Sequence, residues 1–96
     1  MRTIMWDFSN NKTYTFRQFS IPSYMMPGLQ RYIEEHIAPG DFLKAVICND
    51  LKKAVELADD ENLANLAAYV GFLYNETPGP CWGSPEKYKK WLSNES

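Results

Sequence analysis

The spacing of apolar residues changes near residue 20, and this change constrains the fold more than any other feature of the sequence. Apolar residues alternate with others over residues 3–8, and residues 13–19 are rich in Thr, Tyr and Phe, as in β-strands. The intervening residues 9–12 form a turn sequence with two asparagines. Beyond residue 20 the apolar residues recur every three or four positions, as on amphipathic helices. The sequence therefore predicts an α+β fold in which an N-terminal β-hairpin, residues 1–20, packs on four or five short helices.

Proline, glycine and capping residues mark where these helices begin and end. The Ala-Pro-Gly segment at 38–40 ends a first helix and begins a second. Asn and Asp at 49–50 favour a break before a third helix, although the shared apolar phase on both sides also allows one bent helix. The acidic run at 59–62 predicts a helix start, and Ser-Pro-Glu at 84–86 opens the last helix.

The length of 96 residues, of which 45% are apolar, supports one hydrophobic core, so we expect a single domain over residues 1–96. Five Phe, six Tyr and three Trp compete for that small core. Apolar surface left uncovered favours a homo-oligomer, most simply a C2 dimer. The residues that we expect in the core are Trp6, Leu29, Ile33, Phe42, Val46, Leu51, Leu66, Val70 and Leu73.

Charge and targeting signals limit the partners of this chain. Ten basic and twelve acidic residues give a formal charge of -2, which offers no broad basic face for general nucleic-acid binding or for an anionic membrane. The first residues lack the apolar stretch of a signal peptide, and no window approaches the length of a membrane span. We therefore expect a cytoplasmic protein whose cysteines, Cys48 and Cys81, are free thiols.

The sequence offers few groups for catalysis. His36 is the only histidine, and a pairing of it with Cys48 or Cys81 rests on composition alone. No phosphate-loop, dinucleotide-binding or hydrolase-elbow motif occurs, and no spacing of ligands indicates a metal site. We expect a protein that is not an enzyme and that holds no metal and no cofactor.

The segment 72–87 joins two helices and combines aromatic, amide, Pro and Gly residues. Candidate ligand contacts are Tyr74 and Trp82 for stacking and Arg31, Asn49 and Asn75 for polar groups. Each has a structural alternative. The Trp82 ring could fill the core, the two asparagines could cap helices, and Arg31 could lie on a solvated helix face.

Several short motifs carry a resemblance to known sequences: SYM at 23–25, RYIE at 31–34, the Pro-Gly turn at 39–40 with Phe42-Leu43, Ala45-Val46 and Asn49-Asp50-Leu51, DDEN at 59–62, FLYN at 72–75 and CWGSPEK at 81–87. Over residues 21–92 the chain resembles a family of short proteins encoded in bacteriophages and prophages, most of which have no assigned function. Members usually begin near the SYM motif, so the resemblance implies that residues 1–20 are an addition or a variable part. It implies a mobile-element setting and transfers no catalytic or binding residue.

Within that setting we expect a non-enzymatic host-defence antagonist that acts in the host cytoplasm. In the first hypothesis it sequesters a small, nucleotide-derived signal, with a pocket at the loop of residues 75–83. In the alternative it is an inhibitor or regulator that binds one host protein through an aromatic patch of Trp82, Tyr88 and Trp91. A pocket at the loop favours sequestration, and a flat exposed aromatic patch favours inhibition.

Overall fold

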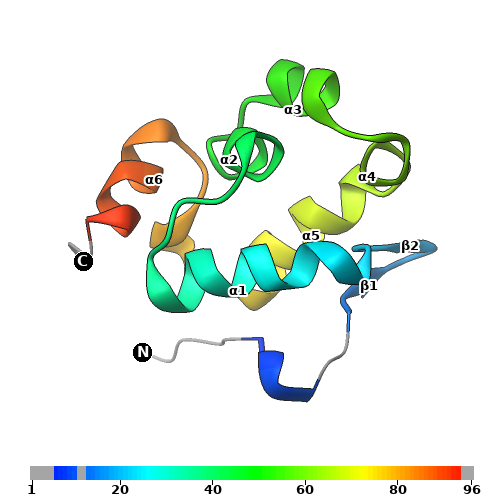
Figure 1. Cartoon of the computed structure of the whole chain (residues 1–96), viewed down its shortest axis with the longest axis horizontal. Helices are drawn as coiled ribbons and strands as arrows, with labels where there is room; N and C mark the ends of the chain where they lie inside the picture. The colour runs from blue at the N-terminus through cyan, green and yellow to red at the C-terminus, as the bar shows by residue number, and fades with distance from the viewer. Residues whose placement is uncertain (1–5, 11–12, 94–96) are drawn as a thin grey trace.

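The computed structural model describes residues 6–10 and 13–93 (Figure 1). In chain order its elements are η1 (Phe8–Asn10), β1 (Thr15–Phe16), β2 (Phe19–Ser20), η2 (Ser23–Met25), α1 (Met26–Glu35), α2 (Asp41–Ile47), α3 (Leu51–Leu57), α4 (Asp60–Ala64), α5 (Leu66–Glu76), η3 (Gly79–Cys81) and α6 (Pro85–Leu92), where η denotes a 3-10 helix. The helices form a compact globule with α6 at one end and the hairpin at the other. This arrangement confirms the predicted α+β class.

The hairpin lies further along the chain than predicted. Its two strands pair antiparallel, with Thr15 opposite Ser20 and Phe16 opposite Phe19. Both strands therefore lie within residues 13–20. The sequence pattern predicts residues 13–19 as the second strand alone. The turn between them places Arg17 at φ 56, a positive value of the kind that tight hairpin turns require.

The predicted first strand, residues 3–8, is wrong for residues 6–8. Residues 1–5 lie outside the described residues. Residues 6–7 form no regular element, and Phe8 begins a 3-10 helix. The Asp7 carboxylate accepts hydrogen bonds from the backbone N–H and the hydroxyl of Ser9, so the chain turns where a strand would continue. The backbone N–H of Trp6 donates to the Glu76 carbonyl at 3.1 Å, which attaches this segment to the end of α5 instead of to another strand.

Side-chain caps begin three of the helices, as the sequence predicts. Asp50 accepts from the Lys53 N–H, Asp59 from the Asn62 N–H, and Ser84 from the Lys87 N–H. These bonds satisfy backbone donors that have no partner within the helix. The break at residues 49–50 is confirmed over the alternative of one bent helix, because Asn49 adopts a left-handed conformation with φ 62 between α2 and α3.

The core gathers around α5, whose buried face carries Tyr69, Phe72 and Leu73. Of the residues expected in the core, five are buried, namely Leu29, Ile33, Phe42, Val46 and Leu73, while Trp6 and Leu66 are partly buried. The prediction is wrong for Leu51, which is 66% exposed, and for Val70, which is 47% exposed. The reason is the position of α3, which packs mainly on α2 and leaves the adjacent face of α5 uncovered.

Across the described residues, no helix combines the length and the apolar character needed to cross a bilayer.

Candidate functional site

A groove of about 560 Å³ lies between α2, α3 and α6. We name it the lysine groove. Its charged lining residues are Asp41, Lys44, Asp50, Lys53 and Lys89, and its other lining residues are Ala45, Cys48, Leu57, Pro85 and Tyr88. Among these, Ala45 and Tyr88 are buried, whereas the five charged residues are exposed. The groove therefore combines an apolar base with charged side chains around it.

The aromatic ring of Tyr88 is held from within the core. The Tyr32 ring stacks on it with 5.7 Å between centroids and 16° between planes, and Tyr32 itself is fully buried. On the groove side, Lys44 Nζ lies 5.7 Å from the centroid of the Tyr88 ring, within the range of a cation–π contact. Burial raises the pKa of the Tyr88 hydroxyl, and the nearby Cys48 and Asp41 add to that shift.

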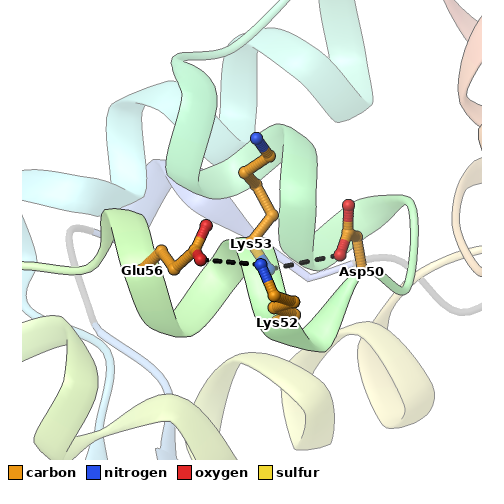
Figure 2. A network of polar contacts seen from close by, with 4 residues as sticks. All are labelled: Asp50, Lys52, Lys53 and Glu56. Carbon is orange, nitrogen blue, oxygen red and sulfur yellow. Dashed lines mark hydrogen bonds and ion pairs between the residues drawn. The ribbon is translucent and has the colours of Figure 1, made fainter.

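Three lysines against two aspartates leave the groove with one excess positive charge, although the whole chain carries a formal charge of -2. Within the part of the chain that the structure describes, only Lys52 forms an ion pair, with 2.8 Å from its Nζ to Glu56 Oε2. Figure 2 shows the Lys53 side chain extending away from that pair, while Asp50 accepts from the Lys53 backbone N–H. The charge on Lys53 thus remains available to a ligand.

A second, mainly apolar groove of about 300 Å³ lies between α3 and α5. We name it the apolar groove. Its lining residues are Val46, Asn49, Asp50, Leu51, Ala54, Leu66, Ala67 and Val70. Asp50 lines both grooves, so they lie on either side of the N-terminal end of α3.

The five residues predicted to contact a ligand are not gathered in either groove. Asn49 lines the apolar groove, and its positive φ gives it a structural role at the corner between α2 and α3. Trp82 is partly buried against the core, in line with its structural alternative. The Asn75 side chain donates to the Tyr14 hydroxyl at 3.3 Å, and Arg31 and Tyr74 are exposed on α1 and α5. Neither groove includes any residue of the predicted pocket at 75–83.

The aromatic patch expected for a protein inhibitor is not present as an exposed surface. Tyr88 is only 7% exposed because it lies under Lys44 and against Tyr32. Trp91 is partly buried, and its indole N–H donates to the Tyr32 carbonyl at 2.9 Å. With Trp82 also packed on the core, these three rings stabilise the attachment of α6 rather than offering a flat face.

The only histidine and the two thiols occupy structural positions. His36 ends α1 in a left-handed conformation, with its Nδ1 2.6 Å from the Trp91 carbonyl oxygen. Cys81 is fully buried, and burial raises the pKa of its thiol. Burial also raises the pKa of Cys48, although Lys44 partly opposes the shift. In the described part of the chain, no three His, Cys, Asp or Glu side chains gather closely enough to hold a metal ion.

Sequence reasoning missed the lysines of the lysine groove. Lys44, Lys53 and Lys89 lie on three different helices. In the sequence, each of them is indistinguishable from an ordinary lysine on the solvent-exposed face of a helix. No family model, no curated protein and no solved structure matches this chain, so the assignment of a site depends on its own geometry.

Proposed function

We propose that this chain is a non-enzymatic binding protein that captures a small, nucleotide-derived anion in the lysine groove. The observation that carries the proposal is that Lys44, Lys53 and Lys89, none in an ion pair with a described residue, line one groove together with Tyr88. Of these lysines, Lys44 lies over the Tyr88 ring. Lysine ammonium groups form charge-assisted hydrogen bonds with phosphate oxygens. An aromatic ring beside them suits the base of the same ligand.

The size and shape of the groove support a small ligand. Its volume of about 560 Å³ falls within the range of roughly 300 to 1,000 Å³ typical of small-molecule sites. The Lys44 side chain is long and exposed, so it can leave the Tyr88 ring. The nucleobase of the ligand would then stack on the Tyr88 ring in place of the Lys44 ammonium group. Lys44 would bind the phosphate of the same ligand. Capture of this kind requires no nucleophile, general base or metal.

The resemblance to phage and prophage proteins supplies the biological setting of the proposal. A defence signal that circulates in the host cytoplasm loses its effect when a phage protein binds it stoichiometrically. In this proposal the chain is therefore a host-defence antagonist that acts by sequestration.

Calorimetric titration of the full chain with AMP, ADP, cyclic mononucleotides and cyclic dinucleotides tests the proposal, with adenosine and inorganic phosphate as partial ligands. We expect one of the nucleotides to bind, and to bind more tightly than either partial ligand. Replacement of a groove lysine, in Lys44→Ala or Lys53→Ala, should weaken that binding at least about tenfold, equivalent to about 1.4 kcal/mol. Recovery of the ligand unchanged after incubation would agree with sequestration.

Lys52→Ala is the matched control, because Lys52 is the sequence neighbour of Lys53 but is paired with Glu56 and does not line the groove. Equal losses in Lys52→Ala and Lys53→Ala would mean that binding reflects general charge attraction, and would overturn the proposal. Absence of binding by all of these nucleotides to the folded chain would also overturn it.

A further inference from the structure

Helix α5 exposes an apolar ridge although it is the central helix of the fold. Apart from Glu76 at its end, this helix contains no charged side chain, so its exposed face lacks the charges usual on a solvated helix face. Ala67, Val70 and Tyr74 are nevertheless exposed, and Tyr74 reaches 76%. Spacings of three and four positions place these three residues on one face of the helix, and together we name them the apolar ridge. The structure thus leaves this face uncovered.

The apolar groove lies directly beside this ridge. Ala67 and Val70 belong to both, and Leu51 and Ala54 of α3 line the groove as well. Leu51 is 66% exposed, and the groove volume of about 300 Å³ has room for one aromatic side chain. A protruding tyrosine and a groove that can receive it therefore lie on the same face, Tyr74 being one helical turn beyond Val70.

We propose that two copies of the chain form a symmetric dimer in which Tyr74 of each copy fills the apolar groove of the other. In a two-fold interface, each contact occurs twice, because residue i of one copy meets residue j of the other and the reverse. An axis that crosses two antiparallel α5 helices close to Val70 brings Tyr74 of one copy opposite Ala67 of the other. The protruding side chain and the groove then match in both directions, which a single unrelated partner would not require.

The polar groups at the groove also suit a tyrosine. Asn49 and Asp50 line it, and their side-chain oxygens can accept a hydrogen bond from the Tyr74 hydroxyl of the second copy. The ridge itself has no charge, and Asp50, the one charged residue that lines the apolar groove, already accepts from the Lys53 N–H and would also accept from the Tyr74 hydroxyl, so it would not be left unsatisfied. The proposal concerns a different face of α3 from the one that lines the lysine groove, and it does not depend on ligand binding there.

Sedimentation velocity of the full chain at up to about 200 µM tests the dimer, since weak homodimers form in this concentration range. We expect a species of twice the 11.1 kDa chain mass. Val70→Asp should abolish it, and Tyr74→Ala should raise its dissociation constant at least about tenfold. Circular dichroism and thermal unfolding of each variant show whether a lost dimer is still a folded chain.

Val55→Asp is the matched control, because Val55 is 44% exposed on α3, close to the 47% of Val70, but does not line the apolar groove. It should leave the dimer intact. A chain that is monomeric throughout the concentration range would overturn the proposal, even if a foreign apolar helix occupied the groove. A dimer that tolerates both Val70→Asp and Tyr74→Ala, or one that Val55→Asp disrupts equally, would also contradict it.

Discussion

The Phe16 ring packs directly on the backbone of Gly71, so that a methyl group placed on Gly71 would lie 2.7 Å from Cδ1 of Phe16. This contact joins the hairpin to the middle of α5. The Ser20 N–H adds a second attachment through its hydrogen bond to Asn65 Oδ1, at 2.9 Å. Strands of two residues each are not stable alone in water. The hairpin therefore depends on α5 for its structure.

Gly71→Ala should destabilise the protein even though Ala favours helices more than Gly does. Overpacking costs about 1 to 3 kcal/mol, against a gain of about 1 kcal/mol in helix propensity. Urea unfolding should show a net loss of about 1 kcal/mol, and this loss should disappear in a Phe16→Ala background. Gly79→Ala is the control, because no atom lies within 4 Å of the methyl that it adds. Stabilisation by Gly71→Ala in the unmodified chain would contradict the contact.

The hydroxyl of Tyr69 donates to Oδ1 of Asn62, and both residues are buried. Removal of either partner leaves the other buried and unsatisfied, which costs about 1 to 3 kcal/mol. We expect Tyr69→Phe and Asn62→Leu each to lower the free energy of unfolding by such an amount. The double variant should lose less than the sum of the two single losses. Additive losses in a double-mutant cycle would show that the two side chains do not interact.

The stability that Asp59 provides should depend on pH. Its carboxylate accepts from the Asn62 N–H at 2.7 Å and from the Tyr24 hydroxyl at 2.8 Å, and these bonds lower its pKa below the ordinary value of 3.8. Because the folded state holds the lower pKa, the contribution is complete above the ordinary value and is lost as the pH falls through the folded value. The difference in Tm between the unmodified chain and Asp59→Ala should therefore be largest near neutral pH and shrink below pH 3.8. A difference that grows in acid would have the wrong sign.

The same contact has a readout on its other partner. The hydrogen bond to Asp59 is the main cause that raises the pKa of Tyr24 to about 12. In Asp59→Ala the absorbance titration of this tyrosine should move back toward its ordinary pKa of 10.0. Comparison with Tyr24→Phe identifies the Tyr24 signal among the six tyrosines. An unchanged titration of Tyr24 would mean that the bond does not form.

Asn49 should tolerate glycine better than alanine. Its φ of 62 lies in the left-handed region, where an ordinary side chain costs about 1 to 2 kcal/mol and glycine costs little. Asn49→Ala should thus reduce the free energy of unfolding by about 1 kcal/mol, whereas Asn49→Gly should be close to neutral. Equal stability of both variants would show that backbone conformation is not what requires asparagine here.

The two thiols should differ in reactivity. Cys81 is fully buried and Cys48 is half-buried, and burial raises the pKa of both. A disulfide reagent added to the folded chain should therefore modify Cys48 first, and Cys81 only on the timescale of unfolding. Mass spectrometry of digested protein identifies the modified residue. Rapid modification of Cys81 under native conditions would contradict its burial.

Local signals in the sequence determined where three helices of this protein begin. Asp50, Asp59 and Ser84 each accept from a backbone N–H three residues further along the chain, so the residues that form each cap are already neighbours in the sequence. The period of the apolar residues likewise determined the α+β class. Strand pairing could not be predicted in the same way, because the alternation of residues over 3–8 does not specify a partner strand. At residues 7–9 the hydrogen bond from the Ser9 N–H to Asp7 forms a turn instead of a strand.

Only the tertiary structure decided which exposed residues lie together. Lys44, Lys53 and Lys89 face one groove because α2, α3 and α6 meet there, and no spacing within a single helix encodes that meeting. The same applies to Leu51 and Val70, whose apolar character predicts burial. They are exposed because α3 packs on α2 rather than over α5. An apolar stripe determines that a helix has a face to bury, but the packing of the other helices determines how much of that face is covered.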